Sequence, residues 1–243
     1  TSGDGISGQD NPQVGSLSVI ADSEVIVASS AKGSVVVWHL NDLENPMVLA
    51  WDSDVDPASN MFGKCLGISK GTSHDTILVG DPREEGGSGD DGAIYAYHKT
   101  TGQYLGQFAP TGDSQYSGFG GSYYFGDAFE VVNDKLIIGV HLDDQGEYPN
   151  SGTLYSWNLD PATGVPTGSA SRGYVESKRS GEYGAWTASH GDYFVSGLGL
   201  KYDGETNTYA HETPWNGQVD VYHKDNIYTP IATLTSGQSS DFW

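Results

Sequence analysis

The stretch Gly152–Trp157 (GTLYSW) reads glycine, any residue, an aliphatic residue, any residue, a small residue and an aromatic residue. Three other stretches follow the same pattern: Gly33–Trp38 (GSVVVW), Gly92–Tyr97 (GAIYAY) and Gly217–Tyr222 (GQVDVY). The pattern therefore recurs about every 60 residues, and such self-similarity at one period is typical of repeat architectures.

Two further elements precede the pattern in each unit. The first is a residue pair that ends in glycine and is aromatic in three of four units: Val14-Gly15, Phe62-Gly63, Phe125-Gly126 and Tyr183-Gly184. The second is an apolar run that ends in a small residue, at 25–28, 77–80, 136–139 and 193–196. A turn and a further strand candidate follow the pattern, as at 104–108 and 231–234. Segments of β-branched and aromatic residues bounded by Gly, Asn and Asp predict four strands per unit.

The predicted fold class is all-β, a β-propeller of four-stranded antiparallel blades. A single four-stranded unit cannot bury both of its faces, and radial stacking of such units is the propeller. A β-sandwich would not produce so long a period. We expect an N-terminal segment at 1–13 and propeller blades over 14–243: about 14–55, 62–112, 125–172 and 183–238, with the start of a further blade at 241–243. Four blades could close on themselves, but a sequence that ends within a motif favours a part of a larger propeller.

These units resemble the FG-GAP repeat, the blade of integrin α-subunit propellers. Phe62-Gly63 and Phe125-Gly126 match its Phe-Gly element, and Gly80-Asp81-Pro82 is one residue away from Gly-Ala-Pro. The resemblance covers residues 14 to about 235 and implies a propeller, usually of seven blades, in an extracellular adhesion protein. Many integrin-type blades hold calcium in a long first hairpin. Here the corresponding turns at 132–135 and 189–192 are too short to supply six to eight oxygen ligands, so the repeat resembles the variety that lacks the calcium loop.

The charge of the chain excludes several classes of partner. Thirty-two acidic residues against 11 basic ones give a net charge of -21, which repels phosphate and argues against nucleic acid and anionic membranes. No apolar run approaches the ~18 residues of a membrane span, so membrane insertion is not expected. The single cysteine, Cys65, cannot form an internal disulfide and is interpreted as a small buried hydrophobe. The composition favours an acidic, secreted or cell-surface protein.

The connections after the second strand of each unit are rich in acids and are weak candidates for binding calcium or another hard cation. The candidate metal ligands are Asp81, Glu84, Asp90, Asp91, Asp143 and Asp144. The alternative is a solvated acidic surface without a metal. No other cofactor is implied.

Aromatic residues in the connections are candidates for ligand binding, because Trp and Tyr supply large, stiff contact area for a protein or a sugar ring. The candidates are Trp51, Tyr148, Tyr202, Tyr209 and Trp215. Trp186 and Tyr124 flank strand starts and are interpreted instead as packing between blades. His39, His98 and His223 occupy one repeat position, so they would be spread around a ring and are interpreted as structural.

The leading functional hypothesis is a non-enzymatic, extracellular recognition or adhesion module that binds a protein or a glycan through its loops. The alternative is a structural subunit of a larger extracellular assembly, in which further blades or a partner chain complete the propeller. A propeller enzyme such as a polysaccharide lyase is less favoured, because it would need clustered Lys, Arg, His or Tyr. No nucleophile elbow, zinc-protease motif or phosphate loop occurs in the sequence, and no catalytic residue is assigned.

Overall fold

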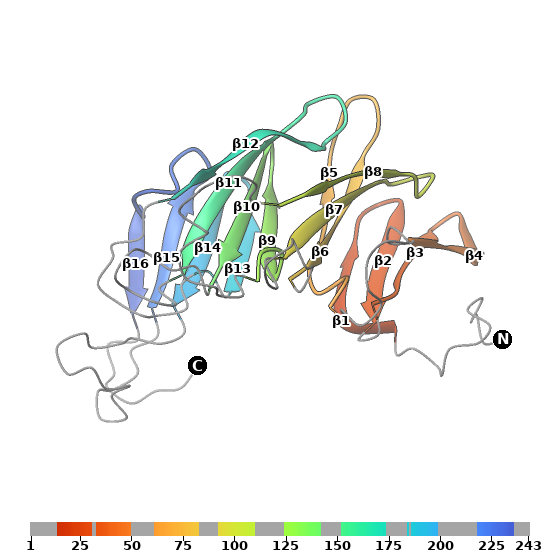
Figure 1. The fold of residues 1–243 in the computed structure, drawn as a ribbon, viewed down its shortest axis with the longest axis horizontal. Helices are drawn as coiled ribbons and strands as arrows, with labels where there is room; N and C mark the ends of the chain where they lie inside the picture. Colours follow the sequence, from red (N-terminus) through yellow and green to blue (C-terminus); the bar gives the residue numbers. More distant parts are fainter. Residues whose placement is uncertain are drawn as a thin grey trace.

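The computed structural model describes residues 14–30, 33–49, 61–82, 92–109, 124–141, 152–173, 184, 186–198 and 218–235. These residues form four antiparallel sheets of four strands and no helix (Figure 1). The first sheet contains β1 (Val14–Ala21), β2 (Val25–Ser30), β3 (Val35–His39) and β4 (Asp42–Leu49), and the second contains β5 (Leu66–Ser69), β6 (Thr76–Asp81), β7 (Ala93–His98) and β8 (Tyr104–Phe108). The third contains β9 (Ala128–Val132), β10 (Lys135–Val140), β11 (Thr153–Leu159) and β12 (Pro166–Arg172), and the fourth contains β13 (Trp186–His190), β14 (Tyr193–Leu198), β15 (Gln218–His223) and β16 (Ala232–Thr235).

Each sheet is a simple meander in which every strand pairs with the next strand of the sequence. The pattern that recurs in the sequence forms the third strand of each sheet, and the apolar run before it forms the second. The prediction of an all-β protein built from four-stranded propeller blades is therefore confirmed.

The four sheets follow one another in an open arc, from the first sheet (red) at one end to the fourth (blue) at the other (Figure 1). The first strands of neighbouring sheets contact each other in succession, β1 with β5, β5 with β9 and β9 with β13. This is the arrangement of propeller blades, whose first strands lie nearest a common axis. These four sheets do not close into a ring by themselves. No helix long and apolar enough to cross a membrane occurs in the described residues.

The hydrophobic core lies between the sheets. Successive residues of a strand point to opposite sides, so in β10 Leu136 and Ile138 pack toward the second sheet while Ile137 packs toward the fourth. We call the side of a sheet that faces the previous unit its preceding face, and the side that faces the next unit its following face. Phe62 and Phe125, the aromatic members of the residue pairs, are fully buried in the first and second of these interfaces.

The glycine of each residue pair makes close packing between the sheets possible. Three of them have φ near +90°, a conformation that favours glycine: Gly63 (+89°), Gly126 (+92°) and Gly184 (+90°). Each packs against a small residue in the second strand of the previous sheet, namely Ser29, Gly80 and Gly139. A Cβ atom on Gly63 would lie 2.5 Å from the Cβ of Ser29. The second residue of the pair must therefore be glycine for two reasons. Its backbone conformation favours glycine, and the neighbouring sheet leaves no space for a side chain.

Trp186, interpreted as a residue that packs between blades, has no blade packed against it in the described part of the chain. Its side chain is 63% exposed, because it lies on the following face of the fourth sheet, which no other described residues cover. Tyr124, given the same interpretation, is half-buried, and its ring lies 5.5 Å from that of His141.

Candidate functional site

The long connections of the chain leave the sheets at one end. In a sequential antiparallel meander, the connections from strand 1 to 2 and from strand 3 to 4 lie at one end of the sheet. The connections from strand 2 to 3 and onward to the next unit lie at the other. Turns at the first end, the turn end, are as short as 133–134 and 191–192. At the second end, the loop end, the connections span 82–92, 141–152 and 199–217.

The predicted ligand-binding aromatics all belong to loop-end connections and lie outside the described residues: Trp51, Tyr148, Tyr202, Tyr209 and Trp215. The same holds for five of the six acids proposed as weak metal ligands: Glu84, Asp90, Asp91, Asp143 and Asp144. The sixth, Asp81, ends β6 opposite Ala93 and is fully buried. Residues 241–243, the expected start of a further blade, also lie outside the described part of the chain.

Four polar side chains meet at the loop end between the second and third sheets. Lys64 and Asp127 hold equivalent positions, each directly after the glycine of its residue pair, and Lys64 Nζ lies 3.8 Å from an Asp127 carboxylate oxygen. The other oxygen of Asp127 lies 3.7 Å from Nδ1 of His141, which follows β10. The ring of Tyr124 packs beside that imidazole. We call Lys64, Tyr124, Asp127 and His141 the loop-end cluster.

The loop-end cluster has two features that are common at binding sites. Tyr124 has a φ of 55°, a left-handed conformation that costs a side-chain-bearing residue about 1–3 kcal/mol and concentrates at functional sites. Nδ1 of His141 is buried and has no hydrogen-bond partner among the described residues, so it retains hydrogen-bonding capacity. An ammonium, an imidazole and a phenol together can bind hydroxyl, carbonyl and carboxylate groups.

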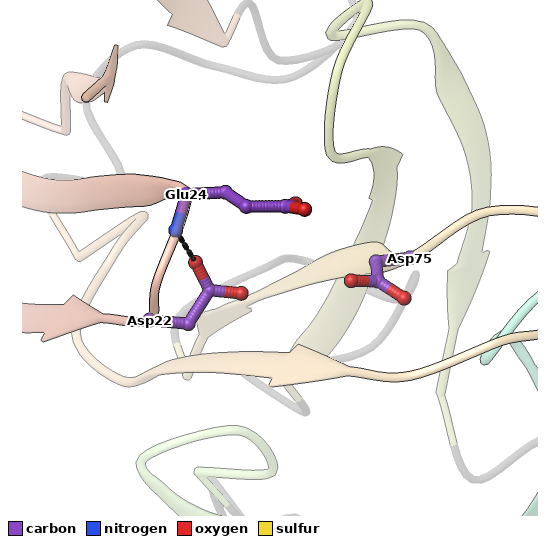
Figure 2. A group of neighbouring side chains, drawn as sticks. All are labelled: Asp22, Glu24 and Asp75. Carbon is purple, nitrogen blue, oxygen red and sulfur yellow. Dashed lines mark hydrogen bonds between the residues drawn. The ribbon is translucent and has the colours of Figure 1, made fainter. Parts of the chain in front are cut away.

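A second cluster lies at the turn end, between the first and second sheets. Asp22 and Glu24 come from the connection between β1 and β2, and Asp75 directly precedes β6 (Figure 2). Oxygen atoms of these three carboxylates lie within 4.8 Å of one another. The backbone N–H of Glu24 donates a hydrogen bond to Asp22 at 2.8 Å (Figure 2). Three converging carboxylates can ligate a hard cation.

An ammonium group already occupies the centre of the turn-end cluster. Lys99 is only 3% exposed, and its Nζ lies 3.0 Å from Asp22, 2.5 Å from Glu24 and 2.7 Å from Asp75. Nζ of Lys70 lies 2.7 Å from both aspartates. The two ammonium groups supply the positive charge that a metal would supply, so this cluster acts as an ionic clamp between the first two sheets.

The hydrogen bonds of the clamp change the pKa values of its members. Burial alone would raise the pKa of Asp22, but hydrogen bonds from Lys70, from the Glu24 N–H and from Lys99 outweigh it and hold that pKa well below its usual range. The pKa of Asp75 is lowered in the same way, against its burial. Burial alone would lower the pKa of Lys99, but its carboxylate partners raise it. All three groups are therefore charged at neutral pH.

A related contact joins the third and fourth sheets, where Lys224 Nζ lies 2.7 Å from Asp134. Sequence analysis missed these contacts, although two signals were present. An acid directly precedes the second strand of every unit, as Glu24, Asp75, Asp134 and Asp192. Lysine follows the histidine that ends the third strand in the second and fourth units, as Lys99 and Lys224.

Cys65 directly precedes β5 and contacts the core between the second and third sheets. Burial raises the pKa of its thiol to about 12. Because the thiolate is the reactive form of cysteine, this residue is an unreactive core side chain, as its interpretation as a small hydrophobe implies.

Comparison with known proteins finds a distant resemblance to designed structures. No protein-family model matches the chain, and no curated protein matches it. The crystal structure of the computationally designed Ika4 protein is 14% identical with a TM-score of 0.47, and the match covers 88% of this chain and 93% of that one. The computationally designed Ika8 protein is also 14% identical with a TM-score of 0.48, and the match covers 92% of this chain and 49% of that one.

Proposed function

We propose that this protein is a non-enzymatic recognition module of the cell surface or extracellular space, which binds a protein or a glycan through the loop end of its blades. The observation that carries the proposal is that the longest connections between strands all join the sheets at this end. Loops held by a rigid scaffold commonly carry binding function. The aromatic residues Trp51, Tyr148, Tyr202, Tyr209 and Trp215 all belong to these connections.

The loop-end cluster supports the proposal from described residues. Lys64 is 37% exposed and His141 18% exposed, so both side chains are partly accessible to a ligand close to the ends of β5 and β10. Their hydrogen-bonding groups suit the hydroxyl groups of a glycan and the carbonyl or carboxylate groups of a peptide. The net charge of -21 and the resemblance to FG-GAP blades favour an extracellular adhesion partner over nucleic acid.

The test measures binding of the protein to an immobilised panel of glycans and of extracellular matrix proteins. Trp215→Ala and Tyr148→Ala should each weaken binding to the partner found and leave the melting temperature nearly unchanged. Tyr228→Ala is the matched control, because Tyr228 is an exposed tyrosine (53%) in the connection between β15 and β16, at the turn end. This control should bind like the parent protein.

Two results would contradict the proposal. If Trp215→Ala and Tyr148→Ala lower the free energy of unfolding by about 3–5 kcal/mol, as loss of a buried aromatic does, these residues pack and do not bind. If the protein cleaves an acidic polysaccharide, and His141→Ala abolishes the cleavage, the loop-end cluster is catalytic and the protein is a lyase.

A second candidate function is a structural role in a larger extracellular assembly. It is favoured by the following face of the fourth sheet, where large apolar side chains such as Trp186 and Leu234 remain 63% and 58% exposed. Terminal repeats of stacked proteins usually present a polar outer face. An apolar one indicates that another unit covers it.

A further inference from the structure

A cavity of about 440 Å³ lies at the turn end, between the second and third sheets. Its apolar lining comes from β5, β9, the end of β11 and the connection after β11: Ile68, Val131, Leu159 and Pro161. Leu159 is buried and Pro161 is exposed, so the cavity opens from the surface into the interface between the two sheets. Its volume lies within the range of about 300–1,000 Å³ that is typical of small-molecule sites.

Hydrogen bonds between two connections hold the cavity in shape. The connection between β5 and β6 and the connection between β11 and β12 lie side by side (Figure 1). The backbone N–H of Ser73 donates a hydrogen bond to the carbonyl oxygen of Ala162 at 2.7 Å. The hydroxyl of Thr76 donates one to the carbonyl oxygen of Thr163, also at 2.7 Å. The cavity is therefore formed before any ligand binds, as small-molecule sites usually are.

The carboxylate of Asp160 lines the cavity and has no charged partner among the described residues. Its Oδ1 accepts hydrogen bonds from the backbone N–H groups of Ala162 and Thr163 and from the Thr163 hydroxyl, at 3.0, 2.8 and 3.0 Å. Its Oδ2 accepts none from the part of the chain that the structure describes. The hydrogen bonds from Thr163 lower the pKa of Asp160, so this carboxylate is ionised at neutral pH.

The other polar side chains that line the cavity already have partners elsewhere. Nζ of Lys70 lies 2.7 Å from both aspartates of the ionic clamp. Oδ1 of Asp134 lies 2.7 Å from Nζ of Lys224, and Nδ2 of Asn133 donates a hydrogen bond to Asp192 at 2.6 Å. The unmatched charge of the cavity is therefore the negative charge of Asp160, beside an apolar lining.

We propose that this cavity binds an organic cation, in which an ammonium or guanidinium group contacts Asp160 and an apolar body packs against Val131 and Leu159. Ammonium and guanidinium groups are donors without acceptors, which suits the unused Oδ2 of Asp160. Hydrogen bonds between charged groups are about twice as strong as those between neutral groups. The site lies at the opposite end of the sheets from the loop end, so it is separate from the recognition site proposed above.

A metal ion fits the cavity less well than an organic cation. A hard cation needs several converging oxygen ligands, and within the described ranges the three acids that converge in this way belong to the ionic clamp. The net charge of -21 attracts cations in general, but the apolar lining selects a cation with a hydrocarbon body. A free amine and a lysine or arginine side chain of a partner protein both supply this chemistry.

The test is a titration at physiological salt with n-hexylammonium, followed by NMR through the methyl signals of Val131 and Leu159. These signals should move and reach saturation. Hexan-1-ol has the same body without the charge and should bind about tenfold more weakly. The peptide acetyl-Gly-Lys-Gly-amide separates the two sources of the cation. Tighter binding of the peptide than of hexylammonium identifies a protein side chain, and weaker binding identifies a free amine.

Asp160→Asn should weaken the binding of hexylammonium about tenfold and leave the melting temperature nearly unchanged, because the asparagine oxygen can accept the same three hydrogen bonds. Glu44→Gln is the matched control. It removes one negative charge at an exposed position of β4, in the first sheet, and should bind like the parent protein. Trp215→Ala and Tyr148→Ala should also bind hexylammonium like the parent, so the result does not depend on the proposed recognition function.

The proposal is overturned if neither cation moves the two methyl signals, or if hexan-1-ol binds as tightly as hexylammonium. Equal weakening by Asp160→Asn and Glu44→Gln would also overturn it, because the net charge alone would then attract the cation. Calcium that moves the same signals and displaces hexylammonium would make the cavity a metal site instead. If Asp160→Asn does not fold, Asp160→Ser replaces it with the same expected result, because serine also accepts hydrogen bonds in turns.

Discussion

The backbone of Gly126, at the start of the third unit, packs directly against Gly80 in the second sheet. A Cβ atom on Gly80 would collide with the carbonyl oxygen of Gly126, and Gly126 itself has a φ of +92°. At the previous interface, the Ser29 hydroxyl donates a hydrogen bond to the Gly63 carbonyl oxygen at 2.6 Å. The glycine of the residue pair and the small residue in the second strand of the previous sheet are therefore the two sides of one contact. Both are needed for the sheets to stack.

Gly126→Ala should destabilise the protein by more than the change of backbone conformation alone explains. A left-handed φ costs alanine about 1–3 kcal/mol, and the added methyl would also lie 2.5 Å from the Ala93 carbonyl oxygen. Gly168→Ala separates the two effects, because Gly168 has a φ of +75° but a Cβ atom there would meet nothing within 4 Å. Urea unfolding should show a clearly larger loss for Gly126→Ala. Equal losses would mean that the contact between the sheets is looser than described.

Lys99→Met should lower the free energy of unfolding by about 2–4 kcal/mol, because it leaves three carboxylates without their central ammonium group. This loss is slightly below the usual cost of breaking a buried ion pair, since Lys70 still contacts Asp22 and Asp75. Lys224→Met is the control. Its main partner, Asp134, is 65% exposed, and surface pairs contribute about 0–1 kcal/mol. Similar losses in both variants, measured by urea unfolding, would contradict the role of Lys99 as a clamp.

The sequence was sufficient to predict the blades because each one is built from local signals. The glycine, the alternating aliphatic and aromatic residues and the spacing of about 60 residues recur within each unit. Strand identity depends on this alternation, and the order of strands in a meander follows from their order in the chain. The packing of Phe62 and Phe125 between sheets explains why an aromatic residue recurs beside the glycine.

The contacts between units could not be predicted in the same way. The clamp joins Lys99 of the second unit to Glu24 of the first, and the loop-end cluster joins Lys64 to Asp127 of the next unit. Both pairings depend on which turns of neighbouring sheets lie side by side, which the sequence of a single unit does not contain. For Trp186, the repeat indicated packing, but the exposure of its side chain depends on whether a further sheet follows.

The ionic clamp should make stability depend on pH at both extremes. The pKa of Asp75 is lowered from its ordinary value of 3.8, so its contribution is present above that value and is lost as pH falls through the lower pKa of the folded state. The pKa of Lys99 is raised from 10.5, so its contribution is present below that value and is lost as pH rises through the higher pKa. Urea midpoints should therefore be highest between these limits.

Variants of the ionic clamp test which residues cause the loss of stability at acid and at alkaline pH. Asp75→Asn should weaken the acid dependence of the urea midpoint, and Lys99→Met should remove the alkaline loss attributed to this lysine. If Lys99→Met leaves the alkaline dependence unchanged, another group is responsible for it.

Glu130→Gln should stabilise the protein at neutral pH. Glu130 lies in β9, where burial raises the pKa of its carboxyl group above the ordinary 4.5, partly offset by a hydrogen bond from the Ser189 hydroxyl in β13 at 2.8 Å. Folding therefore favours the protonated form, and the stability contributed by this group falls as pH rises from 4.5 through the folded-state pKa. Glutamine is uncharged and can still accept the Ser189 hydrogen bond, so its advantage in urea unfolding should be present at about pH 7 and absent at about pH 4.

Glu44→Gln, at an exposed position of β4, is the control and should show no such difference. A Glu130→Gln variant less stable than the parent at neutral pH would mean that the ionised carboxylate stabilises the contact between the third and fourth sheets.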